Sequence, residues 1–392
     1  MAISASTASA GHMLRPGSVG SGDAAARGTG DGGDANARLG HAAYLARRHF
    51  PELDGLRALC VLLVITAHVH GGAWTPLGGA QGVIGFFVLS GFLITTLCAR
   101  EASALGRVAL GAFFVRRGFR ILPLYLVVLA AYVAFVLVLG QEPDKRAGLE
   151  FALPYYLTFT NEIALYWSHP AGAVPFFQTW SLGVEEKFYV AWPVLAYAVL
   201  AGRPRARGAV LIVVLAGLLV VQLATGAAWA GWYEALAIGC LLALALHAER
   251  GYRVASRLAG PWSAAAAVVV LVADQLLVGG GVSLARSVYP WVVAWLIVAL
   301  ILADSSVARA ARSRPAVLVG TRSYGMYLTH LLALVVVERW LRPTTALTPA
   351  ALLSLVLAAA VTFGIADVLH RTVEAPMIRM GRRLGDRARS AT

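Results

Sequence analysis

The sequence predicts an all-α protein, a polytopic membrane bundle of about ten transmembrane helices with both termini in the cytoplasm. The chain of 392 residues is 59% hydrophobic and only 14% charged, whereas soluble domains carry roughly 25% charged residues. Several apolar runs reach the ~18–22 residues that cross a bilayer as a helix. Arginines gather in alternate connections between these runs. These observations exclude a soluble enzyme of this size.

The two ends of the chain differ in composition from the part between them. Residues 1–45 are rich in Gly, Ala, Ser, Asp and Arg and hold few large apolar side chains. Such a segment cannot bury a core, so we expect a disordered tail. It lacks an apolar stretch, so we expect no cleaved signal peptide. The membrane domain is predicted over 46–376 and a basic cytoplasmic tail over 377–392.

Ten apolar runs are candidate membrane spans. They cover residues 56–73, 82–99, 119–140, 180–201, 208–226, 229–247, 262–278, 288–304, 318–340 and 349–372. Lipid offers no hydrogen bonds to an open backbone, so these runs are expected to form a bundle of helices.

The arginines predict which side of the membrane each connection faces. Six segments that share one side carry nearly all of them: Arg47 and Arg48; Arg100, Arg107, Arg116 and Arg117; Arg203, Arg205 and Arg207; Arg250, Arg253 and Arg257; Arg309, Arg312 and Arg314; and Arg379, Arg382, Arg383, Arg387 and Arg389. The other side carries only Lys145, Arg146, Arg286 and Arg342. Basic residues favour the cytoplasmic side, and an even number of spans places both termini there. Topology therefore explains the net charge of +13 before nucleic-acid binding does.

Two further features bear on the architecture. The connection 141–179 is long and rich in aromatic residues and prolines. Loops of this length are often functional, and we expect this one to lie at the interface or to cap a cavity. Cys60, Cys98 and Cys240 all fall within predicted spans, with no CxxC pair, and are expected to be buried free thiols.

The first predicted span carries an arginine and a histidine. Arg57 and His68 are eleven residues apart, which returns nearly to the same helix face about 16 Å further on. A neutral imidazole in a protein interior is suited to act as general base for a hydroxyl. The structural alternative is a histidine satisfied by an interhelical hydrogen bond. His70 lies nearby, but no carboxylate or cysteine supports a metal pair, so no metal site is predicted.

A second candidate is the basic segment 116–123 at the start of the third span. Arg117 and Arg120 are three residues apart and share a helix face. Guanidinium groups bind phosphates through paired hydrogen bonds, which favours a phosphorylated ligand. The alternative is an ordinary positive anchor at the membrane surface.

Three further groups of polar residues lie in or beside spans. Ser181, Glu185 and Tyr189 recur every four residues and share one helix face. Glu185 is expected at a depth in the membrane comparable to that of His68. At that depth its carboxylate would orient a histidine or bind an acceptor hydroxyl. Tyr324, Tyr327 and His330 also share a face, and we favour helix packing with interhelical hydrogen bonds for them. The small residues of segment 85–92 likewise favour packing over chemistry.

Taken in order, these motifs resemble those of the acyltransferase-3 family, which are integral-membrane O-acyltransferases. The resemblance covers about residues 50–380 and rests on six segments: LDGLR with the later His (53–68), FFVLSGFLIT (86–95), RRGFRILPLY (116–125), QTWSLGVEEKFY (178–189), SYGMYLTH (323–330) and EAP (374–376). Each motif is modest alone, and their common order makes the match specific. Lys187 stands where the family commonly has an uncharged polar residue, a departure that bears on acceptor choice.

The resemblance implies roles for individual residues. It implies that His68 is catalytic and Arg57 essential, that Arg117 and Arg120 contact an acyl-coenzyme A donor, and that Glu185 is the motif glutamate. We therefore expect His68 and Glu185 to be catalytic and Arg57 to bind the donor with the other two arginines. An acceptor-binding or structural role is expected for Ser181, Tyr189, Tyr324, Tyr327 and His330. The family's tyrosine–histidine motif corresponds to Tyr324, Tyr327 and His330. No permanently bound cofactor is implied, and acyl-CoA, in particular acetyl-CoA, would be the donor substrate.

The sequence therefore predicts a membrane-bound O-acyltransferase of the inner, or plasma, membrane. His68 would deprotonate an acceptor hydroxyl, which attacks the thioester, while Arg57 positions the donor. The acceptor is open among polysaccharide, lipid-linked sugar, peptidoglycan and a macrolide-like metabolite; membrane lipids are expected neighbours and nucleic acid is not. The rival hypothesis is a glycan or lipid transporter, which the lack of an internal repeat disfavours.

Overall fold

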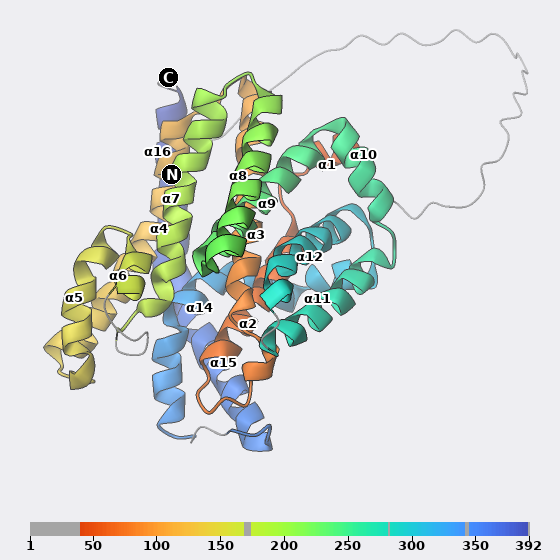
Figure 1. Ribbon diagram of the computed structural model, residues 1–392. Coiled ribbons are helices and arrows are strands. Elements are labelled where there is room, and N and C mark those ends of the chain that lie inside the picture. Colours follow the sequence, from red (N-terminus) through yellow and green to blue (C-terminus); the bar gives the residue numbers. More distant parts are fainter. Residues whose placement is uncertain (1–39, 168–173, 281–282, 342–344, 391–392) are drawn as a thin grey trace, which may run out of the picture. The chain divides into compact units, whose positions relative to one another are not determined.

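In the computed structural model, residues 40–167, 174–280, 283–341 and 345–390 are described, and every regular element within them is a helix (Figure 1). The longer helices are α1 (His41–Ala46), α2 (Pro51–His68), α3 (Gln81–Leu105), α4 (Leu110–Val133), α5 (Arg146–Leu157), α6 (Asn161–Trp167), α7 (Trp180–Val194), α8 (Pro204–Thr225), α9 (Ala228–His247), α10 (Glu249–Leu258), α11 (Ser263–Gly279), α12 (Ser283–Leu302), α13 (Ser306–Ala311), α14 (Arg314–Glu338), α15 (Pro349–Leu369) and α16 (Ala375–Ser390). The all-α class is confirmed.

Short helical segments extend or connect these helices. Three are 3₁₀ turns: η1 (Thr75–Leu77), η3 (Pro143–Lys145) and η5 (Phe177–Thr179). Three are π-helical continuations of α4, α7 and α15: η2 (Ala134–Val138), η6 (Leu195–Val199) and η7 (His370–Glu374).

Fewer helices than the ten predicted spans are both long enough and apolar enough to cross a membrane. Within the described residues, six helices are long and apolar enough to cross a membrane, or seven if the bent pair of α10 and α11 counts as one span. The three other predicted spans exist as helices α2, α7 and α14 but do not reach this threshold. Polar and ionisable side chains lower their hydropathy, and the predicted site residues Arg57, Glu185 and His330 are among these side chains.

Helices α2 and α14 pack against each other in the same direction. Near their starts, a Cβ added to Gly320 would lie 1.8 Å from the carbonyl oxygen of Asp54. Near their ends, the rings of His68 and His330 approach to 4.8 Å between centroids. Gly320 therefore allows the two backbones to come into contact. Small residues commonly serve this role in membrane helices, because the hydrophobic effect does not favour helix association in lipid.

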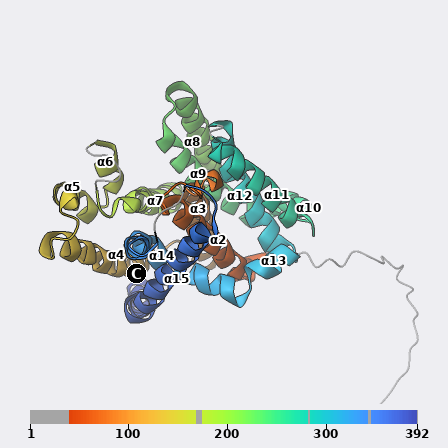
Figure 2. The same ribbon diagram turned by 90° about the horizontal axis from the view of Figure 1, so that it is seen from below.

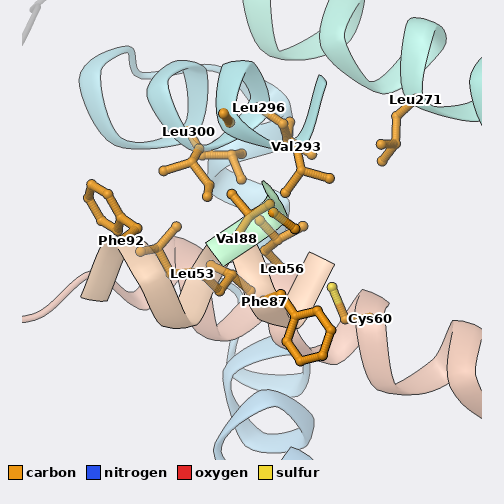
Figure 3. Close-up of a cluster of buried hydrophobic side chains, with 14 of the residues drawn as sticks. Leu53, Leu56, Cys60, Phe87, Val88, Phe92, Leu271, Val293, Leu296 and Leu300 are labelled. Atoms are coloured by element: carbon orange, nitrogen blue, oxygen red, sulfur yellow. The ribbon is translucent and has the colours of Figure 1, made fainter. Parts of the chain in front are cut away.

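The main apolar cluster joins α2, α3 and α12. Figure 3 shows Leu53 and Leu56 of α2, Val88 of α3 and Leu296 of α12 gathered together, and each is at most 4% exposed. Helix α9 also packs closely on α3: a Cβ on Gly91 would lie 2.1 Å from the carbonyl oxygen of Leu236.

Helix α8 lies at the edge of the bundle (Figure 2), and only 6% of its apolar window is buried. Its exposed side chains include Val213, Val220 and Leu223. An exposed apolar face of this length is what a helix facing lipid requires, so the structure and the hydropathy agree that the protein is a multi-pass membrane protein.

Three predicted segments differ from their expected form. The long connection 141–179 contains helices α5 and α6 instead of loop alone, and Figure 1 shows them beside α4; its residues 168–173 lie outside the described part. The predicted tail 1–45 overlaps α1, whose Tyr44 is fully buried, while 1–39 lie outside the described residues. Residues 377–390 form most of α16, which packs along α4 through Gly381 and Gly385. The three cysteines are buried and free, as predicted.

Candidate active site

A pocket of about 100 Å³ opens between α2, α3, α4, α7 and α14. Eight of the ten predicted site residues line it: Arg57, Arg117, Arg120, Ser181, Glu185, Tyr189, Tyr324 and Tyr327. The remaining lining residues are Val83, Phe86, Ser90, Ile121, Leu182 and Ser323. Five helices far apart in the sequence therefore bring the predicted polar residues to one cavity.

One end of the pocket is basic. Arg57 donates from Nη1 to Oδ1 of Asp54 at 3.0 Å, and the second Asp54 oxygen lies 2.8 Å from Nε2 of His49. Asp54 is 4% exposed, so the arginine is held by a buried carboxylate one turn earlier in α2. This contact fixes the direction of Arg57 toward the pocket.

The other two arginines project from α4 at the same end. The guanidinium carbon of Arg117 lies 3.7 Å from the ring centroid of Tyr189, a stacked cation–π contact. Arg120 is exposed and has no hydrogen bond or ion pair to any described residue. Helix α16 supports this part of α4, because Gly381 lets it approach the Phe119 side chain. Two guanidinium groups are thus positioned with donors available to an anionic ligand.

The middle of the pocket holds a hydrogen-bonded carboxylate. Ser90 Oγ donates to Oε1 of Glu185 at 2.9 Å, and Tyr189 Oη donates to Oε2 at 2.7 Å. Tyr189 Oη also lies 2.9 Å from Ser90 Oγ, which closes the group. Both oxygens of the glutamate are therefore held by neutral donors from α3 and α7.

Two aromatic rings meet at the end of the pocket away from the arginines. Tyr327 donates from Oη to the carbonyl oxygen of Gln178 at 2.6 Å and accepts from Ser181 Oγ at 2.7 Å. Its ring meets that of Phe86 edge to face, 6.2 Å between centroids. We call these two side chains, Phe86 and Tyr327, the aromatic partition.

His68 and His330 lie beyond this partition and do not line the pocket. Their rings meet edge to face, and each Nδ1 lies within 2.8 Å of a backbone carbonyl oxygen: that of Val64 for His68 and that of Tyr327 for His330. A carbonyl can only accept a hydrogen bond, so each Nδ1 carries the proton and each Nε2 holds a lone pair. His330 is fully buried, and its Nε2 has no partner among the described residues. The structure thus presents two imidazole bases side by side.

The sequence pattern of the family described as an acyltransferase domain matches residues 50–371. This range contains the arginine pocket, the held glutamate and the histidine pair. The chain belongs to the acyltransferase-3 family.

Curated members of this family resemble the chain at modest identity. The peptidoglycan O-acetyltransferase of Listeria monocytogenes is 27% identical over 366 residues, 86% of this chain and 57% of that protein. A candidate peptidoglycan O-acetyltransferase of Bacillus subtilis is 29% identical over 365 residues, 85% of this chain and 56% of that protein. A candidate O-acetyltransferase of Staphylococcus aureus is 34% identical over 168 residues, 42% of this chain and 28% of that protein. The chain thus spans little more than half of the first two. No solved structure is a significant match to it.

For this acyltransferase-family chain, the structure adds residues that the sequence interpretation missed. Ser90 was assigned to packing, although it lines the pocket and bonds the motif glutamate. Its position inside the family segment 86–95 was the available signal. Tyr324 lines the pocket and also donates to the Ile121 carbonyl oxygen at 2.9 Å, the interhelical bond expected of it.

Lys187 lies elsewhere. It pairs with Glu162 at 2.5 Å and lines a separate apolar pocket of about 210 Å³ between α7, α8 and α9. Within the described residues, no group of three or more potential metal ligands occurs.

Proposed function

We propose that the protein is a membrane O-acyltransferase that moves an acetyl group from acetyl-coenzyme A to a hydroxyl of a carbohydrate acceptor, such as the glycan of peptidoglycan. The observation that carries this proposal is the order of groups from Arg57 to His68: three arginines that line the pocket, the bonded Glu185 in the same pocket, and a pair of imidazole bases on the other side of the aromatic partition. An anionic donor and a hydroxyl acceptor need these groups in this order. The names of the relatives support acetyl and peptidoglycan as the first choices to test.

The proposal includes a topology. Ten helices cross the plasma membrane, with both termini in the cytoplasm, because the arginine-rich connections then lie on the cytoplasmic side. Helices α2, α7 and α14 count among the ten although they carry polar residues. Several of their polar side chains face the pocket, and others pair with neighbouring helices, as Lys187 does with Glu162 and Arg322 with Asp367, which is how membrane proteins accommodate such groups. The Arg57 level of the pocket then faces the cytoplasm, where acetyl-CoA is made.

The reaction is a proton transfer coupled to acyl transfer. Nε2 of His68 accepts the proton of the acceptor hydroxyl, and the acceptor oxygen, which reaches past the rings of Phe86 and Tyr327, forms a bond to the thioester carbonyl carbon. The carbon–sulfur bond breaks, and the proton passes from His68 to the departing coenzyme A sulfur. Arg117 and Arg120 bind the phosphates of the donor, and Arg57 positions the donor in the pocket. The main-chain carbonyl of Val64 keeps His68 in the tautomer that this step requires.

The test is acetyl transfer by the purified, detergent-solubilised protein. The substrates are radiolabelled acetyl-CoA and a panel of peptidoglycan fragments, lipid-linked sugars, polysaccharide and macrolides. The His68→Ala variant is compared with His247→Ala, because His247 in α9 also bonds the carbonyl four residues earlier, at 2.8 Å, but lies away from the pocket.

Labelled product formed by the natural chain and by His247→Ala, and absent with His68→Ala, supports the proposal. A natural chain that transfers no acyl group from any donor to any acceptor contradicts it and favours the transporter hypothesis instead.

A further inference from the structure

We infer that the pocket admits only a short acyl group and that Phe86 sets the limit on chain length. The inference rests on the proposed function, because it concerns the acyl group of the donor. It assigns a specificity-determining role to a residue that the sequence interpretation placed in helix packing.

The first argument is size. The pocket holds about 100 Å³, whereas a cavity of about 150 Å³ accommodates benzene, which has six carbons. An acetyl thioester places one carbonyl and one methyl group beyond the sulfur and fits such a space. A hexanoyl chain adds four methylenes and does not fit beside the thioester.

The second argument is where the acyl group must lie. The arginines mark the phosphate end of the donor, so its acyl end points away from them, past Glu185 toward the aromatic partition. The apolar side chains there are Val83, Phe86 and Leu182, and the hydroxyl groups of Ser181 and Tyr327 are hydrogen-bonded to each other. The methyl group of an acetyl therefore meets mostly apolar atoms, whereas a longer alkyl chain would run into the ring of Phe86.

The third argument is which wall residue can be changed. Tyr327 is fixed by hydrogen bonds to the Gln178 carbonyl and to Ser181, so its position also serves the link between α7 and α14. Phe86 makes no hydrogen bond through its side chain; its ring fills space against Tyr327. Shortening Phe86 thus enlarges the pocket at the end away from the arginines while leaving the hydrogen bonds of Tyr327 in place.

The experiment compares acetyl-, propionyl-, butyryl- and hexanoyl-CoA as donors for the natural chain and for Phe86→Leu, Phe86→Val and Phe86→Ala. The readout is the ratio of kcat/KM between donors, which does not depend on how much of a preparation is folded. Phe87→Leu is the matched control for Phe86→Leu, because Phe87 is the next residue of α3, is fully buried and does not line the pocket.

For the natural chain we expect each added methylene to lower kcat/KM by about tenfold or more, as one methylene does in a tight apolar pocket. The Phe86 series should reduce this preference progressively with side-chain size, and Phe87→Leu should keep it. A natural chain that uses hexanoyl-CoA as well as acetyl-CoA overturns the inference, as does a Phe86 series with an unchanged ratio. Either result leaves acyl transfer itself established. Absence of transfer from every donor contradicts the proposed function instead.

Discussion

The arginine-lined pocket and the histidine pair use polar groups in opposite ways. In the pocket, Glu185 is bonded on both oxygens by Ser90 and Tyr189, and Arg57 is bonded by Asp54. In the histidine pair, each imidazole is bonded only through Nδ1, and the Nε2 atom of His330 is buried without a partner among the described residues. Satisfied groups hold a shape before substrate arrives, and an unsatisfied buried atom is costly until something bonds it. The comparison therefore separates a binding region from a reacting region.

The largest expected effect tests the reacting region. His68→Ala should lower kcat by about 10² to 10⁴-fold, the contribution of a positioned general base, and should leave the KM for acetyl-CoA nearly unchanged. Steady-state kinetics on the purified protein measure both constants, and His247→Ala should behave as the natural chain. An increase in donor KM with unchanged kcat would place His68 in the binding region and break the comparison.

The next effect tests the binding region. Arg120→Ala should raise the KM for acetyl-CoA by about 10- to 100-fold with little change in kcat, because a charged hydrogen bond contributes about 1.5–3 kcal/mol. Arg116→Ala is the matched control: Arg116 pairs with Glu101 at 3.4 Å and does not line the pocket. Equal donor KM values for the two variants would remove Arg120 from donor binding.

A third change acts on both regions at once. Gly320→Ala places a methyl group against the Asp54 backbone, so α2 and α14 must separate; overpacking of this kind costs about 1–3 kcal/mol. Thermal unfolding in detergent should occur at a lower temperature than for Gly364→Ala, where nothing lies within 4 Å of the added carbon. Equal unfolding temperatures would show that the contact between α2 and α14 is looser than the structure describes.

The smallest effect sharpens the description of the pocket. Ser90→Ala removes one of the two hydrogen bonds to the Glu185 carboxylate, while Tyr189 keeps the other; a bond to a charged group contributes about 1.5 kcal/mol or more, so kcat/KM should fall about tenfold. The same assay of kcat/KM measures it. A loss as large as that of His68→Ala would mean that Ser90 takes part directly in the chemistry.

The sequence predicted the helical class and most of the site because both depend on local patterns. Hydropathy identifies apolar runs, and the periodicity of Ser181, Glu185 and Tyr189 places these residues on one helix face. In the structure, Glu185 and Tyr189 are hydrogen-bonded to each other in the pocket, and Ser181 is hydrogen-bonded to Tyr327. The order of the motifs along the chain then indicated the family that the match over residues 50–371 confirms.

The parts that the sequence did not predict depend on contacts between distant segments. His68 and His330 become neighbours only because glycine allows α2 and α14 to touch, and nothing local signals that contact. Ser90 is a small residue in an apolar helix, a pattern that fits packing equally well. Residues 377–390 carry the charges of a solvated tail, and their helix is recognisable only from the close contacts of Gly381 and Gly385 with α4.

The aromatic partition has a consequence for the membrane itself. A line of ionisable groups from Arg57 to His68, joined by water, would conduct protons and dissipate the potential across the bilayer. Phe86 and Tyr327 interrupt that line with two packed rings, one of them anchored by hydrogen bonds. On the proposed topology, this contact keeps the free protein from conducting protons across the membrane between acyl-transfer events.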